Sequence, residues 1–185
     1  MGKDTVRQEA QHLFTRGLYI TEYKLLVVLD QNEPDEEDVP IVIDRSSHIY
    51  GSCRLAAYLY LYLILREMPP SAEINKTLVL RLKTLLESNH KNLLSVWRDD
   101  LYLLLWIATV GSMAARLLPE AEYFVEILTK VVQSLGLQTM DGFKDVIGQI
   151  VWIEDYCREA TSSYLWDRIK PGASSESAKV LVCSH

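Results

Sequence analysis

The chain has 185 residues, of which 49% are apolar and 24% charged, and its net charge at pH 7 is −6. This length suits one domain that buries roughly 70% of the surface its unfolded chain exposes. An acidic chain without a run of Lys or Arg lacks the basic footprint that nucleic acid binding requires. Three widely spaced cysteines are no disulfide framework and indicate a reducing compartment.

The first 44 residues are predicted to form a helix and an acidic linker. Residues 3–29 have weak helical patterning with a break at Gly17, and they lack the apolar core of a signal peptide. The segment Asp30–Asp38 then carries six acids around Pro34, as solvated linkers do. A calcium loop counted from Asp30 would need Gly at its sixth position and a carboxylate at its twelfth, and it has neither.

The segment Leu55–Leu65 is ambiguous because its tyrosines alternate, which is a strand period. Its length and its Ala pair favour a helix, with Ser52 as the N-cap and Pro69-Pro70 as the end. Ser71 is the predicted N-cap of the next helix. The buried stripe predicted for that helix consists of Ile74, Leu78, Leu82, Leu85 and Leu86.

Further helices are predicted over Leu101–Ala115, from Pro119 to Leu135, over Phe143–Val151 and from Ile153 towards Ile169. Asp99-Asp100 precedes the first of these, and Gly136 ends the second as a C′ residue. The uncharged runs, at most 15 residues long, are shorter than the about 20 residues that cross a bilayer, so we expect no membrane segment. The prediction is an all-α fold, a single bundle of six to seven mostly antiparallel helices over 45–170, followed by a flexible tail over 171–185.

Tests for chemistry give no catalytic, metal or cofactor residue. The histidines and cysteines lack zinc spacing, so we expect the thiols to be small apolar groups and the histidines to lie on the surface or in caps. No nucleophile elbow or glycine-rich phosphate loop is present. Asp99-Asp100 is interpreted as a helix start, with a magnesium site as the alternative. Arg54 is expected to pair with an acid, or alternatively to hold an anionic ligand. The four tryptophans are assigned to the core.

An ordered series of short motifs resembles a known family. The run from Ser52 to Leu61, Cys-Arg followed by an Ala-Ala-Leu-rich stretch, is similar to a helix of the fungal-specific transcription factor domain. Leu103–Ala115 is similar to that family's Leu-Leu-Trp…Gly-Gly-x-Ala-Ala segment, with Ser112 in place of the second glycine. Tyr123–Val125, Leu135–Leu137 and the closing Ile150–Trp152 resemble the elements that follow in the family.

The resemblance implies a helical regulatory domain, set in the nucleus, that acts by binding transcription-regulatory proteins or a small effector and is not an enzyme. In the family this domain follows a zinc binuclear cluster of six cysteines that reads DNA. This chain contains no such cluster, so we expect no direct DNA binding. If the resemblance does not hold, the expected location is cytoplasmic. The signature residues, to which we assign packing roles, are Cys53, Arg54, Trp106, Gly111, Phe124, Gly136 and Trp152. Two alternatives stay open: an all-α metal-dependent enzyme of terpene-synthase type using Asp99 and Asp100, and a plain dimerisation scaffold, with homodimer formation open in either case.

Overall fold

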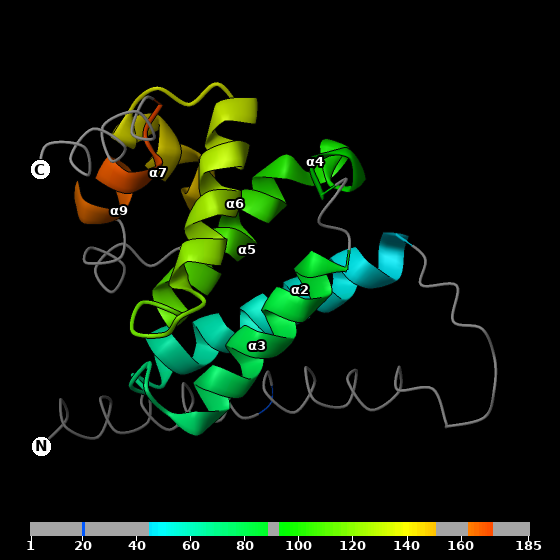
Figure 1. Cartoon of the computed structure of the whole chain (residues 1–185), viewed down its shortest axis with the longest axis vertical. Coiled ribbons are helices and arrows are strands. Elements are labelled where there is room, and N and C mark those ends of the chain that lie inside the picture. The colour runs from blue at the N-terminus through cyan, green and yellow to red at the C-terminus, as the bar shows by residue number, and fades with distance from the viewer. Residues whose placement is uncertain (1–19, 21–44, 89–92, 151–162, 172–185) are drawn as a thin grey trace, which may run out of the picture. The chain divides into compact units, whose positions relative to one another are not determined.

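The structure is a computed structural model that describes Ile20 and residues 45–88, 93–150 and 163–171 (Figure 1). The chain forms two compact units, Met1–Ile43 and Asp44–His185, and the helices discussed below belong to the second unit. Apart from Ile20, the helix and acidic linker predicted over 1–44 lie outside the described residues. The same holds for 153–162 of the predicted last helix and, apart from Pro171, for the predicted tail.

The described part of the second unit is built from helices and turns without a strand, which confirms the all-α prediction. In chain order the elements are α2 Arg45–Tyr60, the π-helical turn η1 Leu61–Leu65, α3 Glu73–Glu87, α4 Leu93–Val96, the 3₁₀ turn η3 Arg98–Asp100, α5 Leu101–Ala114, α6 Ala121–Ser134, α7 Met140–Gly148 and α9 Ser163–Ile169. None of the described helices is long and apolar enough to cross a membrane.

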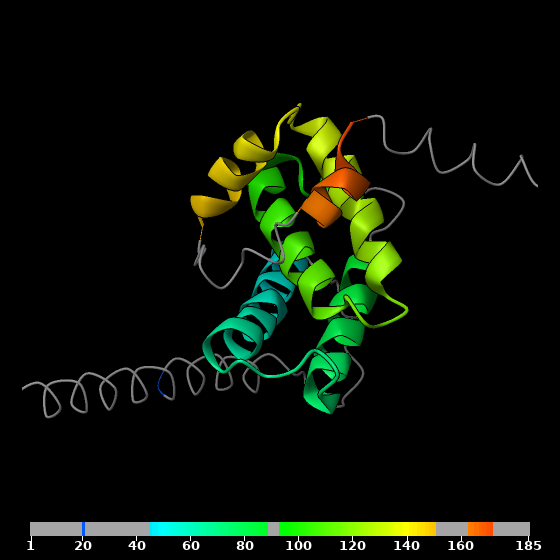
Figure 2. The same cartoon turned by 90° about the vertical axis from the view of Figure 1, so that its left-hand side faces the viewer.

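Helix α5 lies at the centre of the bundle and packs on α2, α3, α6 and α7. It runs antiparallel to α6, and α2 runs antiparallel to α3, while α9 packs on α6 (Figures 1 and 2). Because neighbours surround α5, every residue from Leu104 to Ser112 is buried. A helix that is buried on all sides is apolar all round rather than striped. This explains the uncharged run that the sequence places here.

The segment with alternating tyrosines is a helix that widens at its end. Arg66 N–H donates to the Leu61 carbonyl five residues earlier at 3.0 Å, and Met68 N–H donates to the Tyr62 carbonyl at 2.9 Å. Glu67 then turns the chain with φ 49°, a left-handed conformation that costs a non-glycine residue about 1 kcal/mol. The π-helical turn ends at Leu65, four residues before Pro69, so the prolines follow the helix end instead of forming it.

All three tyrosines of this segment are buried. The rings of Tyr58 and Tyr62 stack with centroids 6.0 Å apart, and Tyr60 lies 5.9 Å from Trp106 of α5. The alternation has a strand period, yet it belongs to a helix. The reason is that α2 contacts both α3 and α5, so more than one of its faces is buried.

Three predicted helix starts differ from the structure. Ser52 lies inside α2 and is buried, since that helix begins at Arg45. Ala72, not Ser71, is the N-cap of α3, and no side chain caps it. The buried Asn75 instead reaches back and donates through Nδ2 to the Pro69 carbonyl at 2.9 Å. Helix α6 begins at Ala121, two residues after Pro119.

The predicted end of α6 is confirmed. Gly136 has φ 65° and follows the C-cap residue Leu135. Gly136 N–H donates to the Gln133 carbonyl and Leu137 N–H to the Val132 carbonyl, each at 3.1 Å, which is a Schellman motif. The glycine supplies the left-handed conformation without the steric cost of a Cβ atom.

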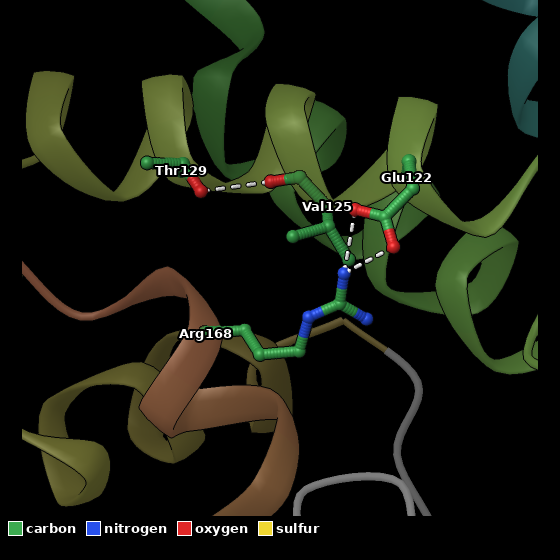
Figure 3. Close-up of polar contacts among 4 residues, drawn as sticks. All are labelled: Glu122, Val125, Thr129 and Arg168. Atoms are coloured by element: carbon green, nitrogen blue, oxygen red, sulfur yellow. Dashed lines mark hydrogen bonds and ion pairs between the residues drawn. The ribbon is translucent and has the colours of Figure 1, made fainter. Parts of the chain in front are cut away.

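An ion pair and an aromatic contact hold α9 in place. One guanidinium nitrogen of Arg168, Nη2, donates to both carboxylate oxygens of Glu122 on α6 at 2.6 Å (Figure 3). Trp166 packs against Phe143 of α7 with ring centroids 5.8 Å apart. Since the Glu122 side chain is largely exposed, the ion pair contributes at most about 1 kcal/mol, and the buried Leu165 and Ile169 anchor the helix.

Candidate functional site

Two signature residues from separate motifs meet between α5 and α6. A Cβ atom placed on Gly111 would overlap the ring of Phe124, whose side chain is fully buried. Gly111 therefore lets the two helices approach until the ring lies directly against the backbone of α5. Both residues therefore have a packing role in the bundle.

The other signature residues also take structural positions where the structure describes them. Trp106 is 5% exposed and packs on Tyr60, and Trp97 is likewise buried, as expected for core tryptophans. Gly136 forms the end of α6. Trp152 lies outside the described residues. Trp97, Trp106 and Gly136 thus bring no reactive group to the surface of the bundle.

Cys53 and Arg54 lie on a half-exposed side of α2. Burial, with a smaller contribution from the negative charge of Asp100, raises the pKa of the Cys53 thiol to about 11. The guanidinium of Arg54 lies 5.8 Å from the ring centroid of Tyr50, one helical turn away. A thiol with a raised pKa stays protonated at neutral pH and is a poor nucleophile.

A polar seam joins α3 to α6 around Tyr123. Lys83 lies 5.7 Å from the centroid of the Tyr123 ring and 3.7 Å from the Glu87 carboxylate. Burial raises the pKa of Tyr123 well above its ordinary value, and the charges of Glu87 and Glu126 add to this effect. The phenol is therefore protonated at neutral pH. The seam orders the contact between the two helices and supplies no activated base.

One serine and one histidine come together, although no sequence motif pairs them. His48 is buried in α2, which corrects the expectation that the histidines lie on the surface or in caps. The Oγ atom of Ser88 lies 3.4 Å from His48 Nδ1 and donates to the Leu85 carbonyl at 2.7 Å. An activated nucleophile needs its hydroxyl hydrogen directed at the base. The shorter contact is the one to the Leu85 carbonyl, so the geometry favours a link between α2 and α3 over an activated hydroxyl.

The acid pair considered for magnesium lies in η3, directly before α5, as the sequence predicts. Asp99 is exposed and Asp100 half-buried at the N-cap position, where it makes no side-chain capping bond. Magnesium held beside a diphosphate needs further carboxylates within reach of the pair. Over residues 45–88, 93–150 and 163–171, no three His, Cys, Asp or Glu side chains gather as metal ligands would.

The outward side of α3 is the surface that sequence reasoning missed. Ile74, which the sequence assigns to the buried stripe, is 42% exposed, and Leu80 is 49% exposed. The buried side of α3 carries Asn75, Val79, Leu82 and Leu86. We use the name α3 outward face for the exposed residues Glu73, Ile74, Thr77, Leu80, Arg81 and Thr84. The sequence does carry a signal for this exposed surface. Ile74 and Leu80 are six positions apart, so they point to different sides of the helix and cannot both lie at the centre of one buried stripe.

The chain was compared with known proteins at three levels. No family model, no curated protein and no solved structure matches it. The resemblance to the fungal-specific transcription factor domain therefore rests on the motif series described above. Its functional implications stay predictions, and the geometry of the described helices is what can support them.

Proposed function

We propose that this chain is a helical regulatory domain of the fungal transcription factor type, which acts by binding partner proteins or a small effector and performs no catalysis. The observation that carries the proposal is the contact between Gly111 and Phe124. Each belongs to a different motif of the ordered series. Their contact gives the series a physical reason, because a glycine on one helix and an aromatic residue on the next are needed together for this close packing.

The chemistry of the described side chains supports binding over catalysis. Burial keeps the thiol of Cys53 and the phenol of Tyr123 protonated at neutral pH. Ser88 donates its hydroxyl to the Leu85 carbonyl at 2.7 Å, while His48 Nδ1 lies farther from it at 3.4 Å. By contrast, large apolar side chains are exposed on α3, α5 and the loop that follows α5, namely Ile74, Leu80, Tyr102 and Leu117. Exposed apolar side chains of this kind occur at protein interaction surfaces.

The proposal is tested by joining the whole chain to an unrelated zinc-cluster DNA-binding domain in a fungal cell that carries a reporter gene for that domain. We expect the fusion to enter the nucleus and to give a reporter output different from that of the DNA-binding domain alone. Leu128→Asp, which places a charge in the core, should abolish the difference. Gln133→Asp, on the exposed side of the same helix, should retain it.

Two results would contradict the proposal. The first is a reporter output that is the same for the native fusion, for Leu128→Asp and for the DNA-binding domain alone. The second is specific binding of duplex DNA by the purified chain, since the proposed domain reads no DNA itself. Thermal stabilisation by magnesium that disappears in Asp100→Asn would favour the metal-dependent enzyme instead.

A further inference from the structure

Helix α9 is short and packs mainly on one neighbouring helix. It has seven residues, Ser163–Ile169, and lies on the outside of the bundle against α6 (Figures 1 and 2). A helix of fewer than about 12 residues is marginal in water on its own. Away from the bundle α9 would therefore lose its helical structure, so this segment docks and folds in a single step.

The contacts of α9 have the pattern of an amphipathic helix that docks on another protein. Leu165 and Ile169, one helical turn apart, are buried, whereas Asp167 is exposed. Arg168 is half-buried and bonds the Glu122 carboxylate of α6 at 2.6 Å (Figure 3). Apolar residues at positions i and i+4 are the anchors by which a helix from one protein binds the surface of another.

The surface beneath α9 combines an aromatic ring with an acid. The buried Phe143 of α7 meets the ring of Trp166 with centroids 5.8 Å apart, so Trp166 supplies part of its cover. On α6, the Glu122 side chain is 78% exposed even with α9 in place. We use the name α9 docking surface for the sides of α6 and α7 that α9 covers, which include Glu122 and Phe143.

We propose that α9 is a displaceable latch on a surface that takes an amphipathic helix of another protein when α9 leaves. The incoming helix has apolar residues four positions apart and a basic residue directly before the second of them, as α9 does with Leu165, Arg168 and Ile169. In the closed state the chain's own segment excludes that partner. The proposal goes beyond the proposed function, because it holds whether or not the partner regulates transcription.

The closed state of the latch is weak enough to open by itself. Its anchors are two buried apolar side chains, and its ion pair is largely exposed and adds little. Docking also costs the conformational entropy of the whole segment. By contrast, α5 is buried on all sides and is exposed only when the bundle unfolds. We expect α9 to be docked about 99% of the time, so that its amides are protected about 100-fold.

This population sets the affinity for a separate helix. A tethered segment such as α9 acts at an effective concentration on the order of 1–10 mM. A ratio of docked to open states of about 100 then implies a dissociation constant on the order of 10–100 μM for the same segment as a free peptide. On the native chain the peptide should bind about 100-fold more weakly, because α9 competes for the surface.

The first test is hydrogen exchange of the full chain, followed by NMR at single amides. The hydrogen-bonded amides of residues 167–170, among them Lys170 N–H, which donates to the Trp166 carbonyl at 2.8 Å, report on the latch. They should exchange at least about 100-fold faster than the amides of residues 105–110 in α5. Such a difference means that α9 opens while the bundle stays folded.

Charge reversal connects this opening to the ion pair. Arg168→Glu should speed exchange of the α9 amides about fivefold or more, because it removes the attraction to Glu122 and adds repulsion. Adding Glu122→Arg to this variant should restore the native rate. Arg81→Glu on the α3 outward face makes the same change at an exposed arginine of another helix, so it is the matched control and should leave the α9 amides unaffected.

The second test uses a fluorescently labelled peptide of residues 163–171 as the probe. Leu165→Asp places a carboxylate at a buried anchor and should hold the latch open in the full chain. In an anisotropy titration this variant should bind the peptide about 100-fold more tightly than the native chain does. A peptide that itself carries Leu165→Asp should bind neither chain. Because no reporter gene is involved, failure here is distinct from failure of the proposed function.

Three outcomes would overturn the proposal. Amides of residues 167–170 that exchange as slowly as those of α5 would make α9 part of the cooperative bundle. Loss of protection in α5 of the Leu165→Asp chain would mean the same, because the latch then does not open by itself. Absence of peptide binding to the folded Leu165→Asp chain at about 1 mM, ten times the highest expected dissociation constant, would show that the α9 docking surface takes no separate helix.

Discussion

Replacing Gly111 by alanine tests the close approach of α5 and α6. In a helix interior this change ordinarily adds about 1 kcal/mol of stability, because alanine is the better helix former. Here the added Cβ overlaps the Phe124 ring, whose Cγ atom would lie only 3.0 Å away, and the ring is fully buried and cannot turn aside. Overpacking of a core costs about 1–3 kcal/mol, and overlap with a ring takes the upper end of that range. We therefore expect a net loss of about 2 kcal/mol.

The assay is urea unfolding followed by far-ultraviolet circular dichroism, with Gly148→Ala as the matched control. Gly148 is the last residue of α7, and a Cβ atom there meets nothing within 4 Å. This control should gain about 0.5 kcal/mol. In a Phe124→Leu background the cost of Gly111→Ala should shrink by about 1 kcal/mol, because the smaller side chain leaves room for the methyl group. If Gly111→Ala is as stable as the native chain, the close packing that we describe is wrong.

Three further predictions concern single positions. Trp106→Ala removes a buried ring and should lower the unfolding free energy by about 3–5 kcal/mol in the same titration, whereas a loss below about 1 kcal/mol would mean that the ring is not buried. Glu67→Gly relieves the left-handed conformation and should raise stability by about 1 kcal/mol, seen as a higher melting temperature; an unchanged or lower one would contradict the strain. Because the pKa of Cys53 is raised from about 9 to about 11, its contribution to stability is complete below about pH 9 and is lost as pH rises through 11. In a chain carrying Cys157→Ser and Cys183→Ser, iodoacetamide should therefore modify Cys53 more slowly at pH 8 than it modifies a free thiol, and faster towards pH 11, while a rate equal to that of a free thiol at pH 8 would refute the raised pKa.

The fold class follows from the sequence because it depends on features that add up over many residues. Long apolar stripes with a helical period, few glycines and short connections leave an all-α bundle as the consistent solution. Gly136 was also predictable, since a glycine after an apolar stripe marks a helix end through local backbone geometry alone.

Helix starts were less predictable because they depend on contacts made elsewhere in the fold. Ser52 and Ser71 have the right residue type for an N-cap. Ser52 nevertheless lies inside α2, and Ser71 lies one residue before the N-cap of α3, where Asn75 bonds the preceding loop. The outward position of Ile74 likewise depends on which side of α3 meets α2 and α5, and periodicity cannot choose between neighbouring faces of one helix.

The residues of the candidate site also divide into those that local sequence places and those whose contacts only the fold reveals. Asp99-Asp100 was correctly placed at the start of a helix, because that position depends on local sequence. The contact of His48 with Ser88 spans 40 residues and has no motif, so only the folded chain reveals it. The apposition of Gly111 and Phe124 is also a property of two helices together. The motif series pointed to both residues without saying that they touch.

The π-helical turn Leu61–Leu65 gives this bundle an unequal tolerance to changes in chain length. Its wider winding holds one residue more than an α-helix needs to cover the same path. Losing one residue there would tighten the turn into regular α-helix and leave the preceding part of α2 in register. The same loss within Leu104–Val110 would rotate the rest of α5 by about 100° and turn core side chains towards the wrong neighbours. Length variation between versions of this chain is therefore expected to collect at the end of α2 and to spare the central helix.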